Sequence, residues 1–264
     1  MLEYGFFVNA LVGVMLLSVA SAVIGTYIVS RRLVSISGGV THACFGGLGL
    51  GYWLGVSPVA TAALFAVGSS LGVQWMSSRH SVREDSAIAV IWALGMAIGT
   101  LFIFLTPGYV PELNAFLFGN ILTISHADLW LFGTFTALLL GFMALFYDKI
   151  VICAFDPDFA RVRRLHVTFI STAMTVLTAV CIVLTIRLVG VMLLMSMLAL
   201  PQMTAEVFCR RFGSIMRLSV AISLLCSVGG LFLATVIEVP CSALIVLVMA
   251  AAYIPARAYK ALAR

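Results

Sequence analysis

Residues 35–55 read SISGGVTHACFGGLGLGYWLG, an apolar stretch rich in glycine that contains one histidine. Because hydrophobic segments flank this stretch on both sides, His42 is expected to lie at membrane depth. Ionisable side chains are costly there and usually face a protein interior or a water-filled path. Glycine permits close helix contact and also non-helical backbone, which is tolerated only inside protein or along a cavity. We therefore predict a broken second membrane span that lines a transport path, and we assign the backbone of this path to Gly38, Gly39, Gly46 and Gly47.

The composition of the chain requires a bilayer as its solvent. Of its 264 residues, 63% are hydrophobic and only 9% are charged, and the mean hydropathy is +1.18. A soluble domain carries about a quarter charged residues and could not bury this much apolar surface. At roughly 20 residues per crossing, the length accommodates about eight or nine helices. We predict an all-α, polytopic membrane helix bundle that forms one transmembrane domain over residues 1–264.

The basic residues predict how the spans are oriented. The expected spans are 6–29, 34–54, 58–76, 87–105, 129–147, 167–185, 188–200, 218–237 and 241–256. With the N-terminus outside, fourteen of the fifteen Lys and Arg residues lie in cytoplasmic connections, and only Arg187 lies outside. This asymmetry follows the positive-inside rule, so we predict an external N-terminus and a cytoplasmic C-terminus. Topology then explains the net charge of +5, and no nucleic-acid partner is expected.

The chain lacks the sequence that binds the phosphates of ATP. Its only lysines are Lys149 and Lys260, and neither follows a glycine, so a G-x-x-x-x-G-K-[ST] loop is absent. We therefore predict that the chain is not the ATPase; as a transport subunit without an ATPase motif, it is not expected to be an enzyme. If it transports with the energy of ATP, a second subunit must dock on its cytoplasmic connections.

Residues 200–213, LPQMTAEVFCRRFG, predict a short cytoplasmic helix of about three turns. Pro201 suits the first helical position, Arg210 and Arg211 lie near the negative end, and Gly213 offers a stop. The residues alone leave two interpretations open, an ordinary amphipathic loop and a docking surface for another subunit.

A second cytoplasmic helix start is predicted at residues 156–161, DPDFAR. Asp156 is a suitable N-cap, and Pro157 suits the first turn. The neighbouring arginines favour capping and ion pairing for the two carboxylates over metal binding.

Four segments in this order resemble the permease subunits of ABC importers for zinc, manganese and iron. They are the Thr-His pair and Gly-Tyr-x-x-Gly ending of residues 35–55, NAFLFGNIL at 114–122, AFDPDFA at 154–160, and VGVMLL at 189–194 continuing to Leu200-Pro201 and Ala205. The resemblance extends over most of the chain. It implies a divalent metal ion as the transported substrate, no permanently bound cofactor, and ATP acting on the partner subunit.

The resemblance also implies partners and a coupling segment. A homodimer in the cell inner membrane would bind a cytoplasmic ABC ATPase and receive metal from an extracytoplasmic metal-binding protein. Alternating access would then follow closure of the ATPases. The family's Leu-Pro-x-x-x-Ala coupling segment implies ATPase-coupling roles for Pro201, Gln202, Thr204, Ala205, Glu206, Arg210 and Arg211.

His42 is the metal ligand that the resemblance implies. Many members of the family have an aspartate four residues earlier, one helical turn away on the same face. This chain has Gly38 at that position, which halves the site. A dimer would present two imidazoles, and these suit zinc, manganese or ferrous iron when further ligands are added. The alternative for His42 is a buried residue that only packs and hydrogen-bonds.

Three other functions are weighed against the metal importer. A permease for a chelated metal, of the siderophore or cobalamin type, would be longer with more spans. A secondary transporter normally carries carboxylates within its spans, and an integral-membrane enzyme needs a polar constellation at that depth. The predicted spans hold almost no charged residues.

Overall fold

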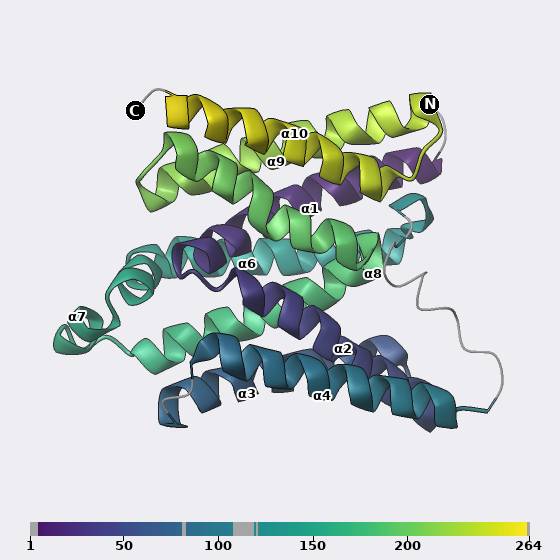
Figure 1. Ribbon diagram of the computed structural model, residues 1–264, viewed down its shortest axis with the longest axis horizontal. Coiled ribbons are helices and arrows are strands. Elements are labelled where there is room, and N and C mark those ends of the chain that lie inside the picture. Colours follow the sequence, from purple (N-terminus) through teal and green to yellow (C-terminus); the bar gives the residue numbers. More distant parts are fainter. Residues whose placement is uncertain (1–4, 81–82, 108–118, 120, 263–264) are drawn as a thin grey trace.

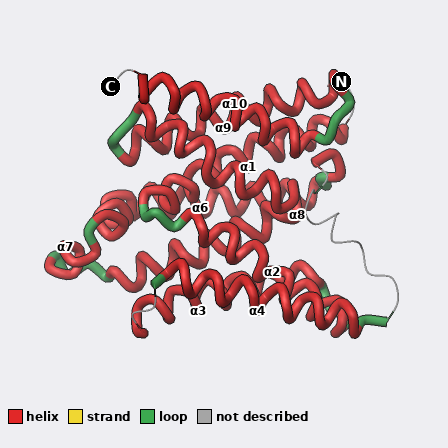
Figure 2. The backbone as a smooth tube through the Cα atoms, viewed as in Figure 1, coloured by secondary structure: helices red, strands yellow, loops and turns green. Residues whose placement is uncertain are grey.

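The computed structural model describes all residues except 1–4, 81–82, 108–118, 120 and 263–264. In the described ranges the chain is helical and contains no strand, which confirms the all-α prediction (Figure 2). The elements in chain order are α1 (Gly5–Ser30), α2 (Val34–Leu54), α3 (Pro58–His80), α4 (Glu84–Leu105), the short 3-10 helix η1 (Ile121–Thr123), α6 (His126–Phe155), α7 (Pro157–Val162), α8 (Val167–Phe208), α9 (Phe212–Ile237) and α10 (Cys241–Leu262).

Helix α8 contains two membrane passes joined at one glycine. Its 42 residues include Gly190 with φ 79° and ψ 175°, a backbone conformation that is essentially restricted to glycine. The arms 167–189 and 191–208 therefore turn back on each other (Figure 1). These arms correspond to the expected spans 167–185 and 188–200.

The number of passes agrees with the sequence-based expectation. Seven described helices, α8 among them, are long and apolar enough to cross a bilayer. When the glycine-rich α2 and the two arms of α8 are counted separately, the described part of the chain makes nine helical passes. Its N- and C-terminal ends consequently lie at opposite ends of the bundle (Figure 1).

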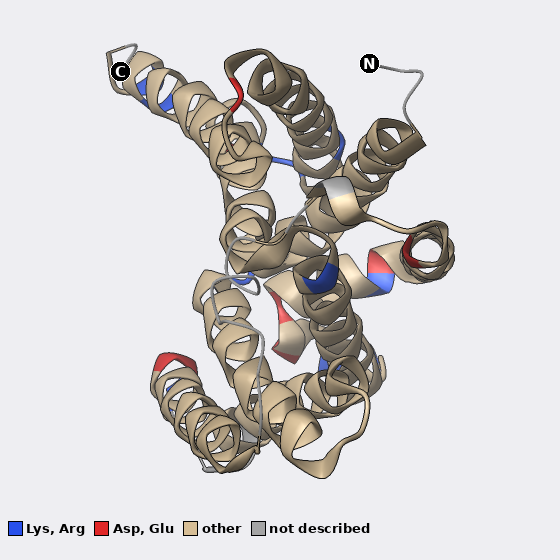
Figure 3. Ribbon diagram, turned by 90° about the vertical axis from the view of Figure 1, so that its right-hand side faces the viewer, with Lys and Arg blue, Asp and Glu red and all other residues tan. Residues whose placement is uncertain are grey.

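Connections and helix ends rich in arginine gather at one end of the bundle. The α1–α2, α6–α8 and α8–α9 connections, the end of α3 and the start of α4 lie at the end at which α10 finishes, on the left of Figure 1. Charged residues are sparse along the helices themselves (Figure 3). We call the end with these connections the basic end.

The core is built around α1 and α8. In the most hydrophobic window of each helix, 61% of the residues of α1 and 67% of those of α8 are buried, against 17% for α4 at the periphery. The hydroxyls of Ser18, Ser21 and Thr26 on α1 donate to backbone carbonyls four residues earlier, at 2.6–2.8 Å. Because these bonds stay within the helix, the buried hydroxyls need no partner in lipid.

Helix α2 is continuous, and the predicted break in the second span is wrong. The helix runs from Val34 to Leu54 and ends at Gly55, which has a left-handed φ of 68°. Its glycines provide close contact with α3 and α4 and do not interrupt the hydrogen bonds of the helix.

Candidate functional site

His42 lies on α2 against the outer helix α4. Its imidazole ring is stacked on the indole of Trp92, with ring centroids 4.5 Å apart and an interplanar angle of 2°. The Nδ1 atom is buried and has no hydrogen-bond partner. A histidine that served only as a hydrogen-bonded core residue would have this atom satisfied. One face of the ring is therefore covered by Trp92, and its Nδ1 atom is buried without a partner from the described residues.

The glycines around His42 let α2 approach two neighbours at once. A methyl group at Gly46 would lie 2.7 Å from the Phe65 ring of α3 and 3.1 Å from the Gly95 carbonyl of α4. Gly39 packs directly on Ile88 of α4 in the same way. Gly47 faces α3, where a methyl group would lie 2.6 Å from the Cα atom of Ala62. These predicted path residues are helix-packing positions.

The position of the missing aspartate faces the second arm of α8. A methyl group at Gly38 would lie 3.0 Å from Cε of Met195, which is the end of a flexible side chain. Gly38 and His42 are separated by one helical turn and share a face of α2. Within the described residues of one chain, no group of three His, Cys, Asp or Glu side chains could hold a metal ion. The described residues of one chain therefore do not form a complete metal site of these ligand types around His42.

The predicted coupling segment does not begin a helix of its own. Helix α8 continues through Pro201 to Phe208, and Gly213 lies inside α9, so the short helix expected between two spans is wrong. Proline breaks a helix because it lacks an N–H for the carbonyl four residues earlier, here that of Met197. The Nε2 atom of Gln202 donates to this Met197 carbonyl at 3.1 Å and to the Ser21 carbonyl of α1 at 3.1 Å.

Burial divides the predicted coupling residues into two groups. Most residues in the first half of the predicted coupling segment are buried within this chain. They are therefore not accessible to a partner subunit. The buried members are Pro201, Gln202, Thr204 and Ala205. The exposed members are Glu206, Arg210 and Arg211. Only the exposed group can contact another subunit.

Helix α7 is a separate short helix at the basic end. Asp156 Oδ1 accepts a hydrogen bond from the Phe159 backbone N–H at 2.9 Å, and Pro157 occupies the first turn, as predicted. Arg161 pairs with Asp158 at 2.7 Å on the surface. Val162 is 82% exposed, so α7 presents an apolar surface next to its charges.

Two of the connections at the basic end, α6–α8 and α8–α9, meet through their flanking residues. The Phe155 ring at the end of α6 meets the Phe212 ring at the start of α9 edge to face, with centroids 6.3 Å apart. Helix α7 follows Phe155, and the exposed residues Arg210 and Arg211 precede Phe212. We call the exposed residues of α7 together with Arg210 and Arg211, which adjoin these two packed rings, the α7–Arg211 surface.

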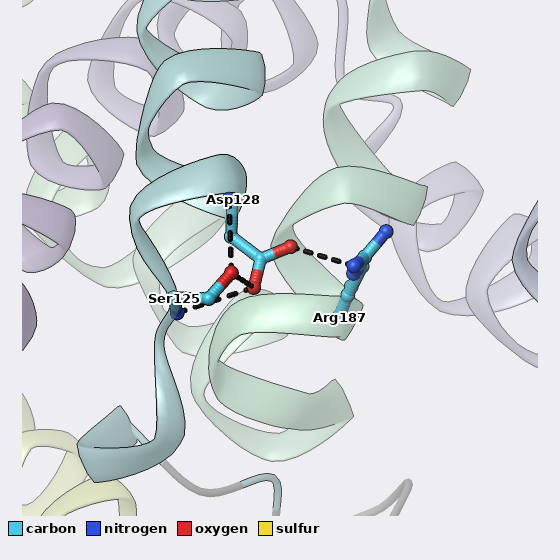
Figure 4. Close-up of polar contacts among 3 residues, drawn as sticks. All are labelled: Ser125, Asp128 and Arg187. Atoms are coloured by element: carbon cyan, nitrogen blue, oxygen red, sulfur yellow. Dashed lines mark hydrogen bonds and ion pairs between the residues drawn. The ribbon is translucent and has the colours of Figure 1, made fainter.

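An ion pair that the sequence did not reveal closes the opposite end of the bundle. Asp128 Oδ1 lies 2.8 Å from Arg187 Nη2, and Ser125 and Asp128 form a reciprocal cap at the start of α6 (Figure 4). Arg187 lies three residues before Gly190, so the pair fixes the turn of α8 against α6. Gly119 packs on the backbone of Gly190 at the same turn.

Comparison with protein families decides the class of this bundle. The model of the ABC 3 transport family matches residues 3–260, which is nearly the whole chain. The chain belongs to the ABC 3 transport family. The matched residues include α2 with His42, helix α7 and the α8–α9 connection.

Curated proteins and a solved structure match this chain over most of its length. A probable metal transport system membrane protein of Chlamydia pneumoniae is 38% identical over 242 residues, 89% of this chain and 83% of that protein. An uncharacterized membrane protein of Synechocystis sp. is 34% identical over 259 residues, 98% of this chain and 92% of that protein. The solved structure of PsaBC from Streptococcus pneumoniae in complex with Fab has the same fold, with a TM-score of 0.84 and 24% identity over 96% of this chain and 91% of that chain.

Proposed function

We propose that this chain is the permease subunit of an ATP-driven importer of divalent metal ions. The observation that carries the proposal is the family match over residues 3–260, together with the Chlamydia relative that is named for metal transport. The protein works as a homodimer in the inner membrane, with its N-terminus outside. It moves zinc, manganese or ferrous iron and holds no metal permanently.

His42 is the transient ligand for the ion in this proposal. The stack on Trp92 fixes the plane of the imidazole, so its nitrogen lone pair and N–H bond lie in a plane parallel to the indole. Two copies of His42 at a dimer interface supply two nitrogen ligands, and water supplies the others. A site with few protein ligands binds weakly enough to release the ion, which transport requires.

The α7–Arg211 surface is the docking site for the ATPase. Because the chain has no phosphate-binding loop, ATP must act on a separate cytoplasmic subunit. The surface combines exposed arginines with the apolar Val162, a mixture that suits a protein interface. Its two connections touch through Phe155 and Phe212, so one ATPase can move both. A metal-binding protein approaches the opposite end, near the Asp128–Arg187 pair.

The second arm of α8 transmits the movement. One end of this arm carries Glu206 at the docking surface, and Met195 within the arm faces Gly38 on α2. Gly190 at the other end supplies the joint. Displacement of the docking end therefore changes the packing next to His42 and switches the side from which the ion is reached.

Uptake by the reconstituted transporter tests the proposal. The chain, its ATPase and its metal-binding protein are placed in proteoliposomes, and zinc, manganese and iron uptake is measured per folded transporter. His42→Ala is expected to reduce uptake by an order of magnitude or more, with folding and ATPase association unchanged. Gly38→Asp restores a carboxylate and is expected to favour manganese over zinc.

A scaffold role of His42 gives a different result. The alanine variant would then lose thermal stability in detergent, while uptake per folded molecule stays normal. That outcome would contradict the ligand role. Uptake in the absence of any ATPase would contradict the importer itself.

A further inference from the structure

A polar cavity of about 470 Å³ lies at the basic end of the bundle. Its wall is formed by the last turns of α1 and α3, the start of α4, and parts of α2, α6, α7 and α8. Neither His42 nor Trp92 lines the cavity. The cavity is therefore separate from the His42–Trp92 stack.

Arg31 contributes a positive charge to this cavity and forms no ion pair in the described part of the chain. Its Nη1 atom donates to the Tyr27 hydroxyl at 3.1 Å and to Ser171 Oγ at 3.5 Å. No carboxylate in the described ranges lies within ion-pair distance of Arg31. Burial lowers the pKa of Arg31, but the neighbouring Tyr27 hydroxyl and the Glu84 carboxylate more than offset this and raise the pKa, so the guanidinium stays charged. A half-buried, unpaired cation is costly, and an anion in the cavity would remove that cost.

Two buried oxygen atoms in the cavity lining, Ser70 Oγ and Gln74 Oε1, have no hydrogen-bond partner. Ser70 and Gln74 lie one turn apart on α3 and both line the cavity. Ser70 is 1% exposed and its Oγ is unpartnered. Gln74 Nε2 donates to Ser171 Oγ at 3.2 Å, but its buried Oε1 accepts no bond. Buried groups of this kind are normally satisfied, so they point to a ligand that carries hydroxyl donors.

The ligand must therefore combine an anionic oxygen with hydroxyl groups. The Glu84 carboxylate, which also lines the cavity, disfavours an anion close to it but accepts hydrogen bonds from hydroxyl groups. A divalent metal ion fits poorly because it would face the Arg31 guanidinium. The cavity lies near the ends of α1 and α3, and basic pockets between membrane helices on the cytoplasmic side bind anionic lipid headgroups.

We propose that this cavity binds a glycerophosphate group, the headgroup chemistry of phosphatidylglycerol. The phosphate faces Arg31, and the glycerol hydroxyls face Gln74 and Ser70. The group comes from a membrane lipid or from a soluble phosphate ester of glycerol. The proposal does not depend on which ion is transported, because no residue of the His42 site takes part.

Binding to the purified full-length chain tests the proposal. Native mass spectrometry in detergent measures retention of phosphatidylglycerol against phosphatidylcholine, and a second arm uses sn-glycerol 3-phosphate. Arg31→Gln is expected to weaken phosphatidylglycerol binding by about tenfold or more, since a hydrogen bond to a charged group is lost. Arg32→Gln removes the same charge from the neighbouring exposed arginine and should change binding by less than about twofold.

Ser70→Ala provides an independent measurement. The Ser70 hydroxyl has no partner in the chain, so its removal should leave the thermal stability of the lipid-free protein unchanged. Binding of the headgroup should fall several-fold in the same variant. A stability loss without a binding loss would overturn the role of Ser70 as a ligand contact.

The remaining outcomes distinguish the sources. Preference for phosphatidylglycerol over the soluble ester supports a lipid site, and equal affinity for both supports a soluble ester with the same chemistry. Equal losses in Arg31→Gln and Arg32→Gln indicate general surface charge and overturn the proposal. Absence of binding by the unmodified chain to either probe also overturns it.

Discussion

The imidazole of His42 lies flat against the indole of Trp92, with 4.5 Å between the ring centroids and 2° between the planes. Helices α2 and α4 carry the two rings, so the stack links the candidate ligand to a peripheral helix. An aromatic pair of this kind contributes about 0.5–1.5 kcal/mol beyond the burial of its area. The orientation of the His42 imidazole therefore depends on the packing of α2 against α4.

Removal of the indole should impair transport through the orientation of His42. We expect Trp92→Ala to lower metal uptake per folded transporter by up to about tenfold, the kinetic equivalent of one aromatic pair. Trp92→Phe keeps a ring and should retain most of the uptake. Equal uptake in the alanine and phenylalanine variants would show that the stack has no role.

Close contact between α2 and α4 should make certain glycines sensitive to a single methyl group. A methyl group at Gly49 would lie 2.9 Å from the Cα atom of Gly99, whereas one at Gly68 on α3 meets no atom within 4 Å. Gly49→Ala should destabilise the protein by about 1–3 kcal/mol through overpacking. Gly68→Ala is the matched control and should be neutral or slightly stabilising. Thermal unfolding in detergent measures both, and equal midpoints would contradict the contact.

Gln202 should matter for stability because it replaces the bond that Pro201 cannot make. Gln202→Leu leaves the Met197 carbonyl without a donor in the buried helix and is expected to cost about 1–3 kcal/mol. Pro201→Ala restores an N–H at this position, so the double variant should recover part of the loss. A double-mutant cycle on unfolding free energies measures this coupling, and strictly additive effects would rule it out.

Changes at the α7–Arg211 surface should weaken ATPase association. Val162→Asp, or Arg210→Glu combined with Arg211→Glu, alters exposed side chains at the basic end. Membrane insertion should be unaffected, while co-purification of the ATPase and metal-stimulated ATP hydrolysis should fall several-fold. Ser57→Glu in the α2–α3 connection at the opposite end is the control. Normal hydrolysis in both surface variants would place docking elsewhere.

Thiol labelling in intact cells should give the orientation of the bundle. In a cysteine-free background, Ser57→Cys in the α2–α3 connection should react with an impermeant reagent from outside. Arg163→Cys at the basic end should react only after the membrane is opened. The reverse pattern would place the basic end outside and remove the docking surface from the cytoplasm.

Sequence reasoning located the helices and caps because those features depend on neighbours along the chain. Hydrophobic run lengths gave the spans, and the Asp156–Pro157 pair gave the start of α7. The continuity of α2 was missed because a glycine suggests a break when its partner is unknown. Gly49 remains helical because it faces Gly99 on another helix.

Contacts with distant segments, which the sequence does not reveal, also determine the structure of the α8–α9 region and of the basic end. Pro201 suggested a helix start, but the amide of Gln202 compensates for the missing N–H and lets α8 continue. The cavity around Arg31 combines side chains from seven helices, so no local pattern contains it. The Trp92 stack and the Asp128–Arg187 pair are likewise contacts between segments far apart in sequence.

Lys260 on α10 completes the hydrogen bonding at the end of α8, next to the docking surface, and it is synthesised late. Its Nζ atom donates to the backbone carbonyls of Val207 at 2.6 Å and Glu206 at 3.3 Å, two carbonyls in the last turn of α8. Such groups at a helix end lack partners within the helix. The ribosome makes Lys260 more than fifty residues after Val207, so a nascent chain that has not yet inserted α10 has an unfinished end to α8. Incomplete chains would then present a poorer site to the ATPase than finished ones, and assembly would favour permeases whose last helix is in place.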